Sequence, residues 1–475
     1  MQYFADLFID GTWRAGSTGE RFPVTDPSDN STITEFAIAS EADCLAAVDA
    51  AEKALPGWAA TAPRVRGEIL RKAFEILTAE KEIFAEIMVR ENGKSWTDAM
   101  AEAGYATEFF RWFSEEAVRI PGEYTVSPAG DKRIFITHQP IGVALLITPW
   151  NFPAAMATRK LAPALAAGCT TVLKPASETP LTAAYMVDVL SRAGLPAGVV
   201  NLVTPVPAGP SVAAMMKHPA VRKLSFTGST EVGRVLLEQA SATIMNTSME
   251  LGGNAPLLVL PGADLDLAVE GTMLAKMRNG GSACTAANRL YVHSSLHDAF
   301  VEKMTAKLTA VRTGSGLDRD NGLGALVSLK ERDKVADLVD TAVSEGAKVE
   351  LGGAKIDPGA FYPPTLLTDV AHGSTINQTE IFGPVTAIVS FDDIDDAVRM
   401  ANDTIYGLIA YVFGEEALAL RVAGRIDAGM VAVNRGVISD PAAPFGGMKQ
   451  SGLGREGGSE GILEFLEVKY IGVSA

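Results

Sequence analysis

The sequence is poor in cysteine, histidine and positive charge, and each shortage excludes a class of protein. Its 475 residues include only three cysteines, Cys44, Cys169 and Cys284, which lie far apart. An odd number without Cys-x-x-Cys spacing excludes a disulfide framework and favours free thiols in a reducing compartment. The five histidines show no metal-ligand grouping, so we expect no metal site.

Basic residues are outnumbered by acidic ones, 41 against 57, which gives a formal net charge of −16. A field of that sign repels nucleic acids and anionic membranes, so we expect neither as a partner. The apolar stretch 140–153 is broken by prolines and is too short to span a membrane. The N-terminus lacks the basic segment and apolar run of a secretory signal, so we expect a cytoplasmic protein.

Helical and strand patterns alternate along the chain and predict two α/β domains, because 475 residues exceed one ordinary core. Ser40 and Asp43 form the capping box of one helix, and residues 63–92 predict a single long amphipathic helix with Gly93 just past its end. Short apolar runs predict buried parallel strands. These runs cover residues 143–147, 170–174, 199–203 and 223–226, and then 256–260, 289–293, 385–391, 409–413 and 430–434.

Two segments fit neither series of strands. Residues 119–138 predict a hairpin with its turn at Ala129 and Gly130, and residues 462–473 predict a terminal strand. Exposed strands are usually covered, and a partner subunit is one way to cover them.

No GxGxxG sequence follows a predicted strand, so the common dinucleotide fingerprint is absent. A nucleotide site is indicated instead by a strand, a turn and a helix. The turn is at Gly228 and the helix opens at Ser229, where free N–H groups suit a pyrophosphate. Lys174 ends another strand and can reach a ribose or a phosphate. An ordinary serine-capped helix and a surface lysine are the alternatives.

The candidate nucleophile is Cys284, which lies among small residues in GGSACTA, downstream of Glu250 in ELGG. A thiol and a carboxylate base are sufficient to form a thioester and to hydrolyse it. The alternative is an inert core cysteine, which we expect of Cys44 and Cys169.

The motifs, taken in order, resemble those of the aldehyde dehydrogenase superfamily. They are TPWNFP (148–153), KPAS (174–177), FTGSTEVG (226–233), ELGG (250–253), Cys284, EIFGPV (380–385) and PFGGMKQSGLGREGG (444–458). The resemblance implies an α/β fold with two parallel-sheet domains and a small β domain. Residues 1–118 and 141–251 would form the dinucleotide-binding domain, 252–448 the catalytic domain, and 119–140 with 455–475 the oligomerisation domain of a homodimer or homotetramer.

The resemblance also implies roles for individual residues. Cys284 would attack an aldehyde, Asn151 would hold the oxyanion, and Glu250 would activate the water that releases the acid. The cofactor-binding residues would be Pro149, Trp150, Lys174, Ser177, Gly228, Ser229, Leu251, Glu380 and Phe382.

The cofactor preference is predicted from the third residue after Lys174. Family members that prefer NAD often carry a glutamate there, whereas this chain has Ser177. A serine leaves room for the 2′-phosphate that a carboxylate would repel, which favours NADP. Glu178 follows directly and could restore the repulsion, so NAD stays open.

The substrate is predicted from Arg159 and Arg278, whose guanidinium groups suit a carboxylate. Together with Ser451 they match the carboxylate-binding set of succinate-semialdehyde dehydrogenases, which predicts oxidation of succinate semialdehyde to succinate. The alternatives are another semialdehyde, a neutral or aromatic aldehyde with both arginines structural, a thioester passed to coenzyme A, or a non-catalytic binding protein.

Overall fold

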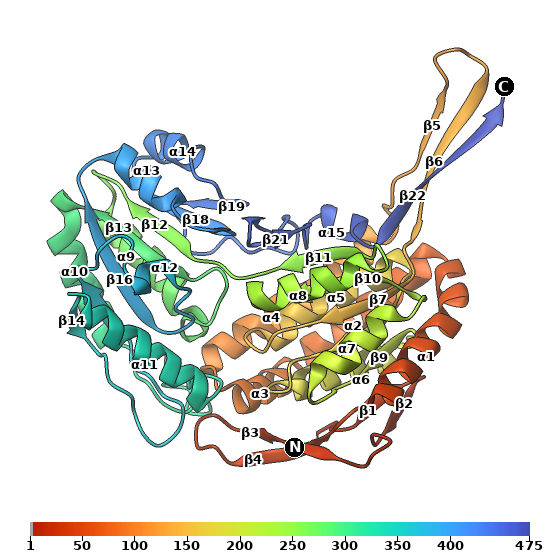
Figure 1. Ribbon diagram of the computed structural model, residues 1–475, viewed down its shortest axis with the longest axis horizontal. Helices are drawn as coiled ribbons and strands as arrows, with labels where there is room; N and C mark the ends of the chain where they lie inside the picture. The colour runs from red at the N-terminus through yellow and green to blue at the C-terminus, as the bar shows by residue number, and fades with distance from the viewer. Residues whose placement is uncertain (1–2) are drawn as a thin grey trace.

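The computed structural model describes residues 3–475, so Met1 and Gln2, the start of the predicted segment 1–118, lie outside it. Two α/β units and a protruding three-stranded arm make up the molecule (Figure 1). This architecture confirms the predicted fold class. Within residues 3–475, no helix is both long and apolar enough to cross a membrane.

The first unit is built on an eight-stranded sheet with the order β2-β1-β9-β8-β7-β10-β11-β21. The strands from β9 to β11 are parallel, and β1 and β21 join them in antiparallel pairing. The bounds are β1 Leu7–Ile9, β2 Thr12–Arg14, β7 Val143–Ile147, β8 Thr170–Lys174, β9 Val200–Leu202, β10 Val221–Thr227, β11 Asn246–Glu250 and β21 Gly452–Leu453.

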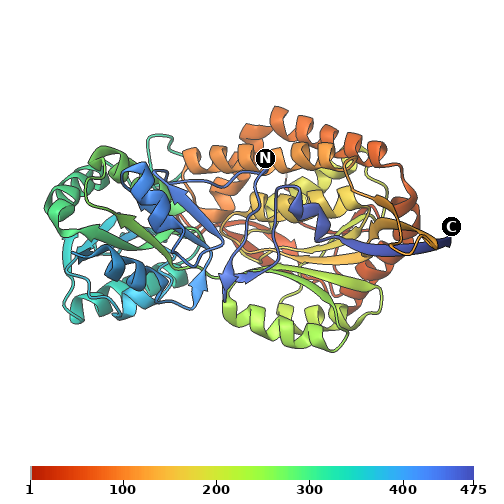
Figure 2. The same cartoon turned by 90° about the horizontal axis from the view of Figure 1, so that it is seen from above.

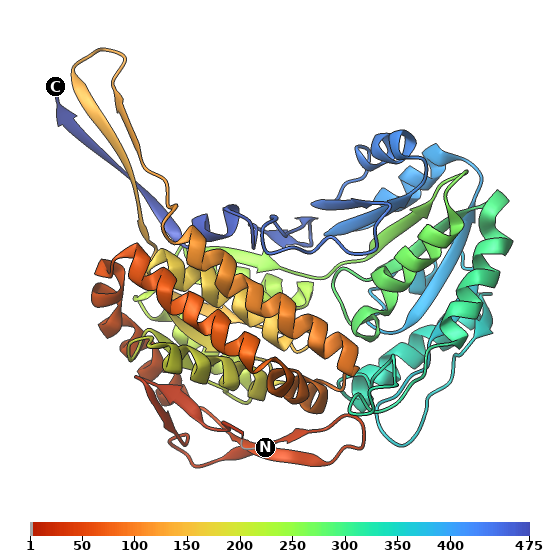
Figure 3. The same cartoon turned by 180° about the vertical axis from the view of Figure 1, so that it is seen from behind.

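Helices cover both faces of this sheet because its strands are apolar on both sides. Val143 and Leu145 contribute to the core beneath one set of helices, and Ala144 and Leu146 to the core beneath the other. Figure 2 shows the two layers of helices on opposite sides of the sheet. One layer has α1 Glu41–Ala60, α7 Ala208–Lys217 and α8 Thr230–Ser241; the other, in front in Figure 3, has α2 Pro63–Ala79, α3 Lys81–Asn92, α4 Trp96–Glu116, α5 Pro153–Ala167 and α6 Pro180–Ala193.

The second unit contains a seven-stranded sheet with the order β14-β15-β16-β13-β12-β18-β19. Its strands are β12 Ala255–Val259, β13 Ala287–His293, β14 Lys348–Leu351, β15 Thr365–Thr368, β16 Val385–Phe391, β18 Ile409–Phe413 and β19 Met430–Val433. Its helices are α9 Leu265–Met277, η1 Arg278–Gly281, α10 Ser294–Thr309, α11 Leu329–Ser344, α12 Thr375–Gln378, α13 Ile394–Asn402 and α14 Glu416–Ala423.

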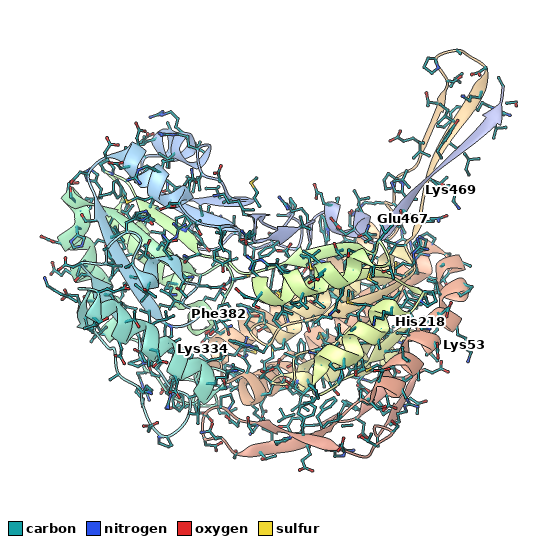
Figure 4. All side chains as sticks on the ribbon, viewed as in Figure 1. Lys53, His218, Lys334, Phe382, Glu467 and Lys469 are labelled. Carbon is teal, nitrogen blue, oxygen red and sulfur yellow. The ribbon has the colours of Figure 1, made fainter. Side chains whose placement is uncertain are left out.

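The arm consists of β5 Glu123–Val126, β6 Lys132–Pro140 and β22 Leu466–Ser474, in the order β22-β6-β5. The predicted hairpin and terminal strand are therefore confirmed, and they pair with each other from Leu466 opposite Pro140 to Ser474 opposite Lys132. The arm extends away from the body, and Glu467 and Lys469 mark β22 in Figure 4. The remaining elements are β3 Arg21–Thr25, β4 Thr32–Ala37, β17 Tyr406–Gly407, β20 Met448–Lys449 and α15 Glu460–Leu463.

The prediction of one helix over residues 63–92 is wrong, because the chain turns at Glu80 and divides the segment into α2 and α3. Glu80 has non-helical angles of φ −103° and ψ 20°. Its carboxylate accepts hydrogen bonds from Tyr185 and Arg192 on α6, at 2.5 and 2.8 Å. Those partners are distant in sequence, so the helical periodicity could not reveal the break.

Candidate active site

A cavity of about 740 Å³ lies at the carboxyl ends of β7, β8 and β10, where it faces α11 and the loop 379–382 of the second unit. Its size is typical of a site for a small ligand or cofactor. The carboxyl edge of an open parallel sheet is also where α/β proteins bind nucleotides. Phe382 and Lys334, labelled in Figure 4, approach the cavity from the second unit.

Cys284 lines this cavity and is partly exposed, whereas Cys44 and Cys169 are fully buried. The loop before it needs its glycines, because a Cβ on Gly281 would lie 2.1 Å from the Gly383 carbonyl oxygen. A Cβ on Gly253 would likewise lie 2.2 Å from the Cys284 carbonyl oxygen. The small residues around the candidate nucleophile therefore permit close backbone packing.

Burial raises the pKa of the Cys284 thiol to about 12. The charge of Glu380 raises it further, and the charges of Arg159 and Arg278 oppose that shift. The thiol is therefore largely protonated at neutral pH before a ligand enters, and nearby positive charge favours the thiolate.

Alkylation of Cys284 is expected to become about tenfold faster per pH unit between pH 7 and 10, because only the thiolate reacts and its fraction rises with pH below the pKa. Mass spectrometry after timed iodoacetamide treatment measures this rate, with Cys284→Ala as the control that should gain no adduct. A rate that is already constant above pH 7 would contradict the raised pKa.

Glu250 ends β11 and is 3% exposed, with neither carboxylate oxygen hydrogen-bonded within residues 3–475. Burial raises the pKa of Glu250 well above its usual range, and the nearby Glu456 carboxylate adds to the shift. Arg159 and Lys160 act in the opposite direction. A carboxyl group without hydrogen-bond partners and with a raised pKa is suited to act as a general base near neutral pH.

Asn151 lies in the loop that follows β7, and one N–H of its side-chain amide donates to the Ser282 carbonyl at 3.1 Å. That bond brings the amide against the loop that carries Cys284. Beside it, the rings of Trp150 and Phe382 meet edge to face at 5.3 Å. Asn151 and Cys284 both line the cavity.

All nine predicted cofactor residues line the cavity. Lys174 ends β8, and burial lowers its pKa. Ser229 caps α8 by accepting a hydrogen bond from the Val232 N–H at 3.4 Å. Glu380 accepts from the Gly253 N–H at 3.1 Å, and burial raises its pKa to about 7.

Sequence reasoning missed the contribution of α11, which adds a mostly polar wall to the cavity. Its lining residues are Glu331, Lys334, Val335, Asp337, Leu338 and Thr341. No motif marks them, because charged residues along a helix are the ordinary pattern of a solvent-exposed face.

The predicted substrate residue Arg159 is 2% exposed on α5 and lies in an aromatic and acidic setting. Its guanidinium donates to the Tyr105 hydroxyl at 2.8 Å and lies 4.1 Å from the centre of the Phe445 ring. Glu456 is 3.4 Å away and also accepts from Lys160 at 2.6 Å, so two cations share one carboxylate.

Arg278 begins the turn before Cys284 and is partly exposed. It donates to the Thr285 hydroxyl at 3.2 Å and lies 5.3 Å from the centre of the Phe152 ring. Within residues 3–475 it forms no ion pair. Neither Arg159 nor Arg278 is among the residues that line the cavity itself.

Ser451, the third predicted substrate residue, lies in the interior. Its side chain is 0% exposed, and its hydroxyl donates to the Gly252 carbonyl at 2.7 Å. The Ser451 hydroxyl oxygen also accepts a hydrogen bond from the Gly407 N–H at 3.0 Å. Both bonds hold the Ser451 segment against Gly252 and Gly407, and a contact between Ser451 and the substrate stays a prediction.

The one group with metal-ligand spacing in the part of the chain that the structure describes is Asp49, Glu52 and His218. It lies on the surface between α1 and α7, with His218 labelled in Figure 4. His218 lies 3.3 Å from Asp49, and both acidic residues are exposed.

An open parallel sheet with a large cavity at its carboxyl edge defines a nucleotide-binding α/β enzyme as the class. Residues 13–471 match the model of the aldehyde dehydrogenase family, and the chain belongs to that family. Enzymes of this family oxidise aldehydes to carboxylic acids with NAD or NADP, and this chain is one of them.

Similar proteins agree with this assignment. The chain is 51% identical to a succinate-semialdehyde dehydrogenase of Paenarthrobacter nicotinovorans, over 93% of this chain and 99% of the relative. It is 44% identical to a glutarate-semialdehyde dehydrogenase of Pseudomonas putida, over 98% of this chain and 97% of the relative. Among solved structures, an E. coli NADP-dependent enzyme aligns with a TM-score of 0.98 at 43% identity, over 100% of this chain and 98% of that one.

Proposed function

We propose that the chain oxidises succinate semialdehyde, or a similar short aldehyde with a carboxylate tail, to the corresponding acid. The observation that carries this proposal is the positive charge near Cys284: Arg159 shares one carboxylate with Lys160, and Arg278 has no ion-pair partner within residues 3–475. Buried or half-buried cations that lack a carboxylate of their own attract an anionic group. The names of the two semialdehyde dehydrogenases above support the same class of substrate.

The residues around the cavity fit a dinucleotide cofactor, for which we propose NADP over NAD. A Cβ on Gly228 would lie 2.4 Å from the Phe226 ring, so this turn before α8 needs a glycine. The N-terminus of α8 then offers N–H groups to a pyrophosphate, and Lys174 offers a cation at the next strand end. When bound, the cofactor supplies the hydride acceptor.

The chemical steps follow from the chain's own residues. The Cys284 thiolate adds to the aldehyde carbon, and the carbonyl electrons move to the oxygen. Asn151 uses one amide N–H for Ser282, which leaves the other for this oxyanion, together with the Cys284 backbone N–H. The carbonyl would re-form as a thioester when the carbon gives up its hydride, for which the bound cofactor would be the acceptor. Glu250 takes a proton from water, whose oxygen displaces the Cys284 thiolate and gives the acid.

We propose that the two units have different functions. Residues 1–118 and 141–251 would bind the cofactor, and residues 252–448 would supply the nucleophile. Residues 119–140 and 455–475 would form the oligomerisation domain, although α15, which belongs to the second of these segments, lies against α5 of the first unit. We also propose a cytoplasmic location, which the free thiols support.

The arm supports a homodimer or homotetramer as the functional form. Its exposed apolar side chains include Tyr124, Val468 and Tyr470, which are 61, 64 and 54% exposed. Both edge strands of its sheet are open within the described chain, and a second copy would cover them. Light scattering after size exclusion should therefore give a mass of at least two chains.

Absorbance at 340 nm with purified enzyme tests the function directly. Succinate semialdehyde should be oxidised much faster than uncharged butyraldehyde, and faster with NADP than with NAD. Equal or better turnover of butyraldehyde would favour the alternative of a neutral or aromatic substrate. That result would still agree with an aldehyde dehydrogenase, but it would contradict a binding site for the substrate carboxylate.

Replacement of Ser177 by glutamate should lower kcat/KM for NADP by at least about tenfold and leave NAD within about threefold, because a carboxylate repels the 2′-phosphate. Ser177 is exposed at the cavity and donates to Glu178 at 3.3 Å. The matched control is Ser177→Gln, which has similar bulk and no charge. Equal losses with both cofactors would show that this side chain does not face the ribose.

A further inference from the structure

A buried ion pair lies behind the cavity, in a part of the chain that contributes no lining residue. Lys94, in the turn between α3 and α4, pairs with Glu102 on α4, and their side chains are 1% and 0% exposed. Gly93 has a left-handed φ of 85°, which ends α3 and allows Lys94 to enter the interior. Two charges taken out of water cost free energy unless each makes further good contacts, so those contacts indicate what the pair does.

Both partners bind the segment that carries Asn151, Lys94 at Asn151 itself and Glu102 at the start of the following helix. Lys94 donates a second hydrogen bond to the Asn151 carbonyl at 2.9 Å. The other carboxylate oxygen of Glu102 accepts from the N–H groups of Ala154 and Ala155, at 2.9 and 3.1 Å. α5 has no capping side chain at its own N-cap residue, Phe152, so Glu102 supplies the cap from a distant helix.

The Asn151 carbonyl also links this pair to the nucleophile loop. It accepts a second hydrogen bond from the Asn279 side chain at 2.8 Å, and the same amide donates to the Ser282 carbonyl at 3.0 Å. One residue earlier, the Trp150 carbonyl accepts from Asn92 at 2.8 Å. The backbone around Asn151 is therefore held from α3, α4 and the Cys284 loop together.

We infer that the Lys94–Glu102 pair is a positioning unit that aims the Asn151 amide at the oxyanion, and this inference rests on the role proposed for Asn151. Lys94 fixes the backbone of Asn151, and Glu102 fixes the helix that begins two residues later. A donor to a developing charge is effective only when it is held in place before the reaction. The pair touches no reacting atom and acts through Asn151 alone.

The test replaces both partners at once, in Lys94→Met/Glu102→Gln, so that no unpaired charge stays in the interior. We expect kcat to fall about 10- to 100-fold, because small displacements of a catalytic group have effects of this size. The KM for the cofactor should stay within about twofold. The rates are measured with the aldehyde that the wild-type enzyme turns over fastest, so an error in the proposed substrate does not affect the result.

The deciding measurement is the same double replacement in an Asn151→Ala background. If the pair acts through Asn151, the double replacement should lower the kcat of the Asn151→Ala enzyme by less than about threefold. Losses of equal size in both backgrounds, or no loss in either, would overturn the inference. Lys223→Met/Glu464→Gln is the matched control: this pair is 3.1 Å apart with Lys223 fully buried, and it contributes nothing to the cavity. It should keep wild-type kcat.

Discussion

Replacement of Glu250 by glutamine should leave one rapid turnover per active site and then nearly stop the reaction. In the proposed mechanism, formation of the thioester uses Cys284 and Asn151, whereas its hydrolysis needs a base to take a proton from water. Loss of a general base slows a step by about 10²- to 10⁴-fold. The Glu250 carboxyl is well suited to this role, because neither oxygen is engaged in a hydrogen bond within residues 3–475.

Stopped-flow absorbance at 340 nm measures this result as a burst close to one reduced cofactor per Cys284, followed by a slow steady rate. Mass spectrometry of the quenched enzyme should find the acyl group on Cys284. Cys284→Ala is the control, and it should give no burst. A variant that loses the burst as well would show that Glu250 is needed before the thioester forms.

The pH dependence of the burst and steady rates, measured for the wild-type enzyme and for Glu250→Gln, separates the ionisation of Glu250 from that of Cys284. Because burial raises the pKa of Glu250, its active ionised form is lost as pH falls, and the steady rate of the wild-type enzyme should fall with it. Glu250→Gln should keep the burst and lose most of this dependence in the slow phase. The burst rate reports the Cys284 thiol instead, whose pKa burial also raises.

Much of the fold could be predicted because parallel strands buried on both faces have a strong local signal. The run 143–147 is fully buried in the structure, and its residues alternate between two cores. Its apolar pattern therefore predicted a buried strand correctly. The break at Glu80 could not be predicted in this way. The side-chain partners of Glu80 are Tyr185 and Arg192, which are more than 100 residues away and leave no local signal.

The site was predictable where backbone shape limits the residue type. Gly228 and Gly253 are required by close contacts, and motifs built on such positions located the cavity. The lining residues on α11 and the buried position of Ser451 were missed for the opposite reason. A charged helix face or a serine in a loop fits many environments, and only the hydrogen bonds of Ser451 to Gly252 and Gly407 show where its side chain lies.

Replacement of Arg278 by methionine should lower kcat/KM for succinate semialdehyde by about 10²-fold or more, and change it less than about threefold for butyraldehyde. Loss of one charged partner from a desolvated pair has an effect of this order. Methionine keeps an apolar stem against Phe152. Since Arg278 has no ion pair within residues 3–475, the replacement leaves no carboxylate unpaired, which makes it a cleaner test than Arg159.

Arg278→Lys is the matched control, because it keeps the charge and loses the planar fork that binds a carboxylate through two bonds. We expect it to retain an intermediate preference for succinate semialdehyde. Equal losses with both aldehydes in Arg278→Met would contradict the carboxylate site. They would indicate that Arg278 acts on the nucleophile loop through Thr285, or through the positive charge that opposes the raised pKa of Cys284. Thiol alkylation rates distinguish those two causes, since only the second slows alkylation at neutral pH.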